Sequence, residues 1–219
     1  MKKKSMVKLL VSLFFIAAFV LWTVLVRFVD IRAIGPEGSV VGFAVFNRAV
    51  HEFFGVNLLL YNITDWAGLF PIAVAFVYAV MGFVQLVKRR SLLQVDGSIL
   101  AMGVFYILVI GVYFFFEVLV INYRPVLIEG VLEASYPSST TLLVTCVIPT
   151  AVLEINTRIK EWKIKLCVSI LAWTFVVFTV VARLVSGVHW ATDIIGGILI
   201  SAGLVLFYTW IAESILKKR

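Results

Sequence analysis

Charged residues are scarce in this chain, since Asp, Glu, Lys and Arg together make up 14% of its 219 residues. A soluble domain is about a quarter charged and about half apolar. In this sequence 63% of the residues are hydrophobic and the mean hydropathy is +1.10. An ordinary soluble core could not cover that much apolar surface. The composition therefore excludes a soluble globular protein and indicates a chain embedded in lipid.

Other absences narrow the fold and the function. The chain has two cysteines, Cys146 and Cys167, and both fall within apolar runs, so we expect no disulfide framework. No polar segment carries a basic patch with interleaved aromatic residues, so the net charge of +7 does not indicate nucleic-acid binding. We find no internal repeat, linker or domain boundary, and therefore expect a single membrane domain over residues 1–219.

Long hydrophobic runs dominate what is present. A helix that crosses a bilayer needs roughly 20 mostly apolar residues. Six runs meet this requirement: Val7–Val29, Trp66–Val87, Ser98–Ile121, Ser138–Ile155, Ile164–Val185 and Trp190–Ile215. The fourth is the shortest and contains Pro149. The sequence predicts an all-α integral membrane protein built as a six-transmembrane-helix bundle.

Two apolar segments have alternative interpretations. The first run follows a lysine-rich start, as a signal peptide does, but it is too long for a signal peptide and no small-residue cleavage site follows it. We therefore expect an anchor. Between residues 36 and 62, the semi-apolar stretch Val40–Leu60 is interrupted by Arg48, His51 and Glu52. It predicts an interfacial or re-entrant helix rather than a seventh span, and whether it covers the site stays open.

The positions of Lys and Arg predict the orientation. Fourteen of the 19 lie in four clusters, in residues 1–8, 88–90, 158–165 and 217–219. Basic loops stay in the cytoplasm, so all four clusters and both termini are expected there. We expect a multi-pass protein of the plasma (cytoplasmic) membrane whose positive charge contacts anionic membrane lipids.

Polar residues collect in three segments at the opposite ends of the predicted spans, over residues 117–125, 136–141 and 182–193. Charged groups at membrane depth are costly, which makes them functional candidates. His189 and Asp193 stand four residues apart at a helix start, so Asp193 can accept the Nδ1 proton of His189 and leave Nε2 free. A helix N-terminus and two guanidinium groups, Arg124 and Arg183, suit a phosphate dianion.

Simpler interpretations remain open at this point. A His–Asp pair at a helix end is often structural, and an Arg at the end of a span often anchors lipid headgroups. Only His189 and Asp193 offer clear metal ligands, and cationic Arg is expected beside them, so we predict no metal site.

All three segments resemble one family pattern, that of the type 2 phosphatidic acid phosphatase superfamily of lipid phosphatases. The family pattern reads Lys-x6-Arg-Pro, Pro-Ser-Gly-His and Ser-Arg-x5-His-x3-Asp. This chain reads Glu117-x6-Arg124-Pro125, Pro137-Ser138-Ser139-Thr140 and Ala182-Arg183-x5-His189-x3-Asp193. The order, the spacing of the third motif and the placement at span ends agree over residues 117–193, although the first and second motifs diverge.

The resemblance implies a role for each matching residue. His189 would attack phosphorus to give a phosphohistidine, with Asp193 orienting it, while Arg124 and Arg183 hold the phosphoryl oxygens. The remaining positions expected to bind substrate are Ser138, Ser139, Thr140 and Glu117. The family needs no metal or other cofactor, so none is expected here.

Two departures from the pattern oppose activity. The second-motif histidine protonates the leaving group in the family, and Thr140 stands in its place. General acid catalysis contributes about 10²- to 10⁴-fold, and a hydroxyl cannot supply it near neutral pH. Glu117 replaces the first-motif lysine and reverses a charge near the expected phosphate. It is predicted either to pair with Arg124 or Arg183, which we favour, or to be protonated and donate a proton.

The leading hypothesis is a metal-independent phosphatase acting on a lipid phosphate or a polyprenyl (isoprenyl) diphosphate at the non-cytoplasmic leaflet. A diphosphate loses a monophosphate whose pKa is only about 6, so its departure needs less acid help than that of a lipid alcohol. The alternative is an impaired family member that binds or helps transport lipid phosphates. A phosphotransferase is a third reading. The sequence identifies neither the lipid headgroup nor the oligomeric state.

Overall fold

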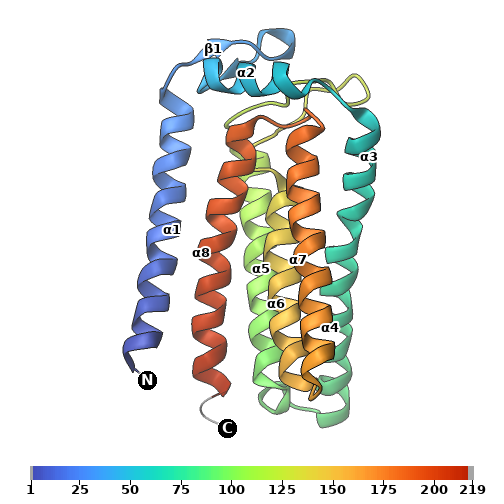
Figure 1. Cartoon of the computed structure of the whole chain (residues 1–219). Coiled ribbons are helices and arrows are strands. Elements are labelled where there is room, and N and C mark those ends of the chain that lie inside the picture. The colour runs from blue at the N-terminus through green and yellow to red at the C-terminus, as the bar shows by residue number, and fades with distance from the viewer. Residues whose placement is uncertain (1, 217–219) are drawn as a thin grey trace.

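The computed structural model describes residues 2–216 (Figure 1). Over this range the chain forms eight α-helices with a short two-stranded sheet and two 3-10 turns. In chain order these are α1 (Lys2–Phe28), β1 (Arg32–Ala33), η1 (Pro36–Gly38), β2 (Val40–Val41), α2 (Ala44–Phe54), α3 (Leu58–Ala67), α4 (Leu69–Arg89), η2 (Leu92–Gln94), α5 (Gly97–Val118), α6 (Ser139–Arg158), α7 (Trp162–Val185) and α8 (Ala191–Leu216).

The six-span prediction is confirmed in the described part of the chain, where six helical segments are long and apolar enough to cross a membrane. They are α1, α3 with α4, α5, α6, α7 and α8, and they run alongside one another as a bundle (Figure 1). Cys146 and Cys167, which lie on α6 and α7, are both free thiols.

The fourth span, α6, is the least apolar and the most buried of the six. Its mean hydropathy is 1.4, against 2.1 to 2.8 for the others. It carries several buried threonines, of which Thr150 donates to the carbonyls of Cys146 and Val147. A helix enclosed by protein satisfies such polar groups internally and needs less apolar surface than one that faces lipid. This explains why the sequence signal was weakest here.

The boundary predicted for the second span was wrong. The helix begins at Leu58 rather than Trp66, and α3 continues into α4 with only Gly68 between them. Asn57 accounts for the start, because its side-chain oxygen accepts a hydrogen bond from the amide of Leu60 at 2.9 Å and caps the helix. The outer turns of α3 are thereby placed beside α7.

Within residues 36–62 a separate helix lies across one end of the bundle (Figure 1), whereas residues 58–62 already belong to α3. This helix, α2, spans Ala44–Phe54 and follows the antiparallel β1–β2 pair. Asn47 fixes it to the start of α8, since its amide nitrogen donates to the Thr192 hydroxyl at 3.0 Å and its oxygen accepts from the Thr192 amide at 3.2 Å. The helix is therefore anchored to the same turn that carries Asp193.

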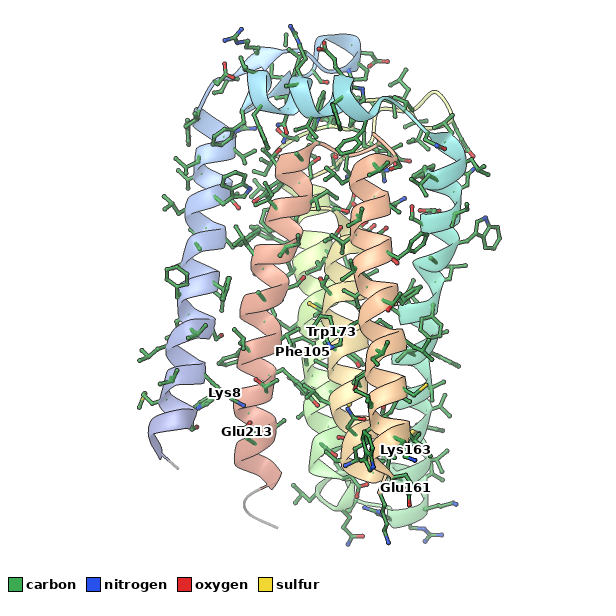
Figure 2. The ribbon with its side chains drawn as sticks, viewed as in Figure 1. Lys8, Phe105, Glu161, Lys163, Trp173 and Glu213 are labelled. Atoms are coloured by element: carbon green, nitrogen blue, oxygen red, sulfur yellow. The ribbon has the colours of Figure 1, made fainter. Side chains whose placement is uncertain are left out.

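The other end of the bundle is where α1 begins and α8 ends (Figure 1). Lys8 pairs there with Glu213, and Lys163 lies at the same end (Figure 2). Buried Glu154 binds Arg158 at 2.7 Å. The basic cluster of residues 217–219 lies outside the described residues. The described clusters thus share one end, opposite the loops that carry the three motifs.

Candidate active site

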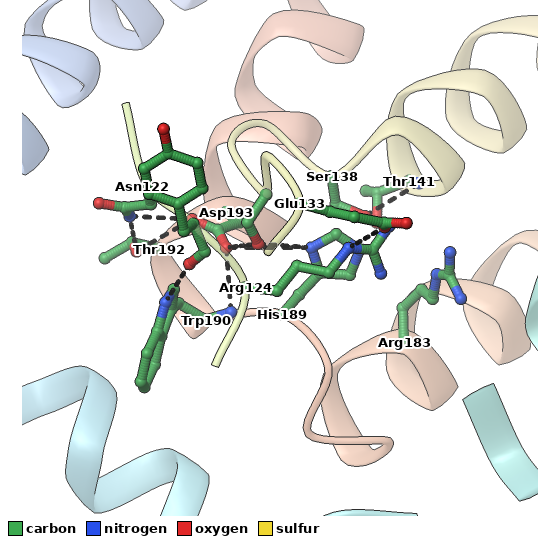
Figure 3. A network of polar contacts seen from close by, with 12 residues as sticks. Asn122, Arg124, Glu133, Ser138, Thr141, Arg183, His189, Trp190, Thr192 and Asp193 are labelled. Carbon is green, nitrogen blue, oxygen red and sulfur yellow. Dashed lines mark hydrogen bonds and ion pairs between the residues drawn. The ribbon is translucent and has the colours of Figure 1, made fainter. Parts of the chain in front are cut away.

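Three segments of the chain meet at the end of the bundle that α2 covers. They are the loop between α5 and α6, the loop between α7 and α8, and the outer turns of α3. The α5–α6 loop folds back on itself, because Arg124 donates its amide to the Glu133 carbonyl at 3.0 Å and Ser135 donates to that of Asn122 at 2.9 Å. This pairing brings the first and second motifs together beside the third (Figure 3).

His189 and Asp193 are adjacent, as their spacing predicted, but they do not form a direct hydrogen bond. His189 precedes α8 and Asp193 lies in its first turn, and both side chains are almost fully buried. The Nδ1 atom of His189 is 3.9 Å from Oδ2 of Asp193, which is too long for a hydrogen bond. The expected direct acceptance of the Nδ1 proton by Asp193 is therefore not observed. The hydroxyl of Ser135 lies between the two groups instead.

The Asp193 carboxylate is held by its own helix and by the α5–α6 loop. Its Oδ2 accepts from the amide of Trp190 at 3.0 Å, which is the arrangement of a helix capping box. Its Oδ1 accepts from the side chain of Asn122 at 3.1 Å (Figure 3). These donors fix the carboxylate in one orientation and compensate for its burial.

His189 is kept neutral and carries an unused nitrogen. Burial, reinforced by the charges of Arg124 and Arg183, holds the pKa of its imidazole well below the ordinary value. Its Nε2 atom is buried and has no hydrogen-bond partner among the described residues. A neutral imidazole with one free ring nitrogen is the form in which histidine acts as a nucleophile.

Arg124 lies next to the His189 ring (Figure 3) and is nearly buried. Its Nε atom is 3.0 Å from a carboxylate oxygen of Glu133, which makes an ion pair. The N–H bond is not aligned with that oxygen, however, and both Nε and Nη1 lack a hydrogen-bond partner within residues 2–216. Arg124 is therefore held in place by charge while two of its donors stay unused.

Arg183 is almost completely buried, with a side chain 1% exposed. Its Nη2 atom donates to the Thr140 hydroxyl at 2.7 Å and to the Asp65 carboxylate at 3.2 Å, and Nη1 donates to Thr64 at 3.3 Å. Its Nε atom has no partner in the described part of the chain. Arg183 is thus fixed on one edge and free at another.

The ring of Tyr61, on α3, unites the two arginines. The guanidinium carbon of Arg183 lies 4.9 Å from the ring centroid and that of Arg124 lies 5.7 Å from it. Two cations so close together repel, and contact with an aromatic face offsets part of that repulsion. The shared ring places both guanidinium groups in one small region beside His189.

The second motif forms the start of α6. The Ser138 hydroxyl caps this helix by accepting from the Thr141 amide at 3.4 Å, and the Ser138 amide donates to the carbonyl of Asp193 at 3.2 Å. Ser139 lines a small pocket together with His189. Thr140 accepts a hydrogen bond from Arg183. Thr140, which stands at the position of the family's acid, therefore helps to position the Arg183 guanidinium.

Glu117 does not pair with either arginine, contrary to the favoured expectation. It is exposed at the end of α5 and lines the same small pocket as Ser139 and His189. Arg124 pairs with Glu133 instead, and Arg183 pairs with Asp65, because those carboxylates are carried by segments that face the guanidinium groups. The alternative that a protonated Glu117 donates a proton stays a prediction.

Several site residues were missed by the sequence analysis. Ser135 precedes the second motif by two positions, and Asn122 falls between Glu117 and Arg124, so proximity to the motifs was their only signal. Tyr61 and Asp65 lie on α3, far from every motif in sequence, where no signal pointed to the site. Within residues 2–216 no group of three or more His, Cys, Asp or Glu side chains is arranged to hold a metal ion.

Comparison with known proteins identifies the family and the fold. A family model described as the PAP2 superfamily matches residues 11–216. The fold is similar to the crystal structure of the first transmembrane PAP2 type phosphatidylglycerolphosphate phosphatase from Bacillus subtilis, with a TM-score of 0.58. That likeness covers 93% of this chain and 95% of the other at 19% identity, and a search of curated proteins found no match. Because the family model spans nearly the whole chain, this multi-pass membrane protein belongs to the PAP2 superfamily.

Proposed function

We propose that the protein is a metal-independent lipid phosphatase that hydrolyses a lipid phosphate or a polyprenyl diphosphate through a phosphohistidine on His189. The observation that carries this proposal is a set of four buried nitrogen atoms that make no hydrogen bond within the described residues, namely Nε and Nη1 of Arg124, Nε of Arg183 and Nε2 of His189. Buried donors are rarely left unpaired. Three cationic donors beside one nucleophilic nitrogen suit a phosphoryl group, whose oxygens guanidinium groups match.

The reaction follows from these positions. The Nε2 lone pair of His189 forms a bond to phosphorus while the bond from phosphorus to the leaving oxygen breaks, and that oxygen keeps the electron pair. Arg124 and Arg183 stabilise the charge on the other phosphoryl oxygens. Water then bonds to phosphorus, the phosphorus–nitrogen bond breaks and its electrons return to Nε2, which releases phosphate.

The leaving group decides how much the missing acid matters. A lipid alkoxide is the anion of an alcohol, which is about as weak an acid as water, so it needs a proton as it leaves. A lipid monophosphate, expelled from a diphosphate, has a relevant pKa of about 6 and leaves without one. Because Thr140 accepts from Arg183 and offers no acid, a diphosphate is the better substrate.

Apolar surface near the site is consistent with a lipid substrate. A groove of about 640 Å³ between α4 and α5 is lined almost entirely by hydrophobic residues. An adjoining groove reaches Tyr113, which also lines the small pocket beside His189. A long hydrocarbon chain lying between these helices would present its phosphate to the arginines.

The site faces the non-cytoplasmic leaflet of the plasma membrane in this proposal, and residues 1–219 act as a single domain with both termini in the cytoplasm. Support comes from the basic residues gathered at the end opposite the site, since basic loops remain cytoplasmic. Membrane lipids surround the bundle, and the lipid phosphate reaches the site from the bilayer.

A phosphate-release assay tests the proposed function. The purified protein is given phosphatidate, a polyprenyl monophosphate and the corresponding diphosphate, each with EDTA present, and His189→Ala serves as the control. We expect release that requires His189, survives EDTA and is fastest with the diphosphate. Release equal to that of His189→Ala with all three substrates would end the enzyme proposal.

A non-catalytic lipid-phosphate binder is the second candidate, and the engagement of Thr140 with Arg183 favours it. A binder would retain the polyprenyl diphosphate without turnover. It would lose affinity on Arg183→Ala but not on His189→Ala. Equal loss in both variants together with turnover supports the enzyme.

A further inference from the structure

His189 and Asp193 are too far apart for a direct hydrogen bond. In a His–Asp pair that works as a unit, the carboxylate receives the Nδ1 proton directly and so fixes which ring nitrogen is free. Here 3.9 Å separates Nδ1 from the nearer carboxylate oxygen. Asp193 cannot close this distance without leaving the Trp190 amide at 3.0 Å and the Asn122 side chain at 3.1 Å, which hold its two oxygens.

Ser135 occupies the space between the two groups. Its hydroxyl oxygen is 2.5 Å from Oδ2 of Asp193 and 2.9 Å from Nδ1 of His189. The side chain is buried, and its backbone amide is tied to the Asn122 carbonyl at 2.9 Å. The hydroxyl is therefore held at this point by the α5–α6 loop and is not a surface group that happens to lie nearby.

Counting protons assigns the direction of each hydrogen bond. A serine hydroxyl has one proton, and a 2.5 Å contact with a carboxylate is typical of O–H donation to that carboxylate. The oxygen can then only accept from His189, so Nδ1 must carry the proton. In a neutral imidazole this leaves Nε2 unprotonated, and Nε2 is the nitrogen without a partner beside the arginines.

We propose that Ser135 is a positioning residue that links Asp193 to His189 and fixes the imidazole in the Nδ1-protonated form. The catalytic role of Ser135 rests on the proposed function, whereas the tautomer of His189 does not depend on it. Ser135 touches neither the phosphoryl group nor the leaving group, and it acts only through His189. The imidazole gains positive charge in the attack on phosphorus. The Ser135 hydroxyl, polarised by its hydrogen bond to the Asp193 carboxylate, then stabilises that charge through its contact with Nδ1.

The tautomer can be measured without any substrate. The chain contains only two histidines, His51 and His189, so nitrogen-15 histidine labelling gives two sets of signals and a His51→Asn variant assigns them. At pH 7 we expect His189 to be protonated at Nδ1 in the unaltered protein. In Ser135→Ala we expect mixed or Nε2-protonated signals, and in Ser135→Thr the Nδ1 form should return. An Nε2-protonated His189 in the unaltered protein would overturn the proposal, even if Ser135→Ala fails to fold.

Turnover provides the second readout. We expect Ser135→Ala to lower kcat by about 10- to 100-fold, the effect of losing one hydrogen bond to a group that becomes charged, with little change in KM. Ser201→Ala is the matched control, since Ser201 is another buried serine, and its hydroxyl donates to the Gly197 carbonyl within α8 and contacts the Cys146 thiol. An unchanged kcat in Ser135→Ala, or an equal loss in Ser201→Ala, would contradict the proposed role. If the unaltered protein shows no turnover, the proposed function fails, while the tautomer measurement still decides the role of Ser135.

Discussion

Thr140 has a different role from the histidine that the family pattern has at this position. The family pattern has a proton donor there, whereas this threonine accepts a 2.7 Å hydrogen bond from Arg183. It thereby helps to hold the guanidinium that would bind the phosphoryl group in the proposed reaction. A residue that positions Arg183 therefore stands where the family pattern has one that protonates the leaving group.

Replacing Thr140 therefore affects binding of the phosphoryl group. We expect Thr140→Val to lower kcat/KM by about 10-fold or more, because a hydrogen bond to a charged group contributes about 1.5–3 kcal/mol. Thr140→Ser keeps the hydroxyl and should stay close to the unaltered protein. Steady-state kinetics on the diphosphate substrate checks both variants. Equal activity in the valine variant would show that Arg183 does not depend on this contact.

The neutral state of His189 predicts an unusual pH dependence. In the proposed reaction the unprotonated imidazole is the nucleophile, and burial near two arginines holds its pKa well below the ordinary value of about 6.5. The nucleophile is therefore still available below that pH, and the acid limb of kcat/KM should lie below it. Profiles measured with a monophosphate and a diphosphate separate this limb from titration of the substrate. An enzyme limb at or above pH 6.5 with both substrates would show that His189 is not shielded in this way.

At this scale the sequence was informative where spacing carries geometry. The four-residue step from His189 to Asp193 predicted their adjacency, and the motif order predicted that Arg124 and Arg183 would lie beside them. The actual hydrogen-bond partner of His189 could not be predicted. Whether a carboxylate reaches a ring nitrogen depends on fractions of an ångström set by the helix cap, and Ser135 enters through a loop whose path has no sequence pattern.

At the scale of elements, the helices follow hydrophobic run length, and the errors occur where local capping decides. The turns of α3 include polar residues such as Asp65, so the hydropathy signal placed the start of this span too late, at Trp66, whereas the Asn57 cap starts the helix at Leu58. The cost of these polar groups is offset by the site, because Asp65 pairs with Arg183. The hydropathy signal of α6 is the weakest of the six spans because its threonines face protein and not lipid.

The contact between α1 and α8 yields a stability prediction. A Cβ atom added at Gly203 would lie 2.7 Å from Cγ1 of Ile16 and 3.2 Å from its backbone nitrogen. The Ser12 hydroxyl also donates to the Gly203 carbonyl at 2.8 Å, which holds the two helices together. We therefore expect Gly203→Ala to lower the free energy of unfolding by about 1–3 kcal/mol.

Gly111→Ala is the control for this prediction, since Gly111 also lies within a helix but has nothing within 4 Å of the added atom. Alanine is the better helix former, so this variant should match or exceed the stability of the unaltered protein. Thermal unfolding in detergent compares the two variants. A Gly203→Ala variant as stable as Gly111→Ala would show that α1 and α8 do not pack this closely.

At the scale of the whole molecule, the bundle separates the described basic clusters from the site. The clusters around Lys8 and Lys163 lie at one end, and the three motif segments lie at the other (Figure 2). The fold class and this separation followed from the sequence because hydropathy and charge are summed over many residues. The α2 helix over the site could be expected only as an interfacial helix, because its position depends on two hydrogen bonds from Asn47 to Thr192.

Orientation in the membrane can be tested by thiol labelling. In a Cys167→Ser background, a cysteine is introduced in the α5–α6 loop by Val131→Cys or at the basic end by Lys160→Cys; Val131 is 58% exposed. A membrane-impermeant thiol reagent applied to intact cells should label only the Val131→Cys protein, because that loop faces outward in the proposed topology. Labelling of only the Lys160→Cys protein would invert the topology.

The most direct test of the account is whether phosphate becomes attached to His189. Protein mixed with polyprenyl diphosphate labelled in its terminal phosphate is denatured within the first turnover, and the phosphorylated residue is located by mass spectrometry. We expect label on Nε2 of His189 and none in His189→Ala. Phosphate release by the unaltered protein without a labelled His189, under conditions in which turnover is stopped before water attacks, would contradict it.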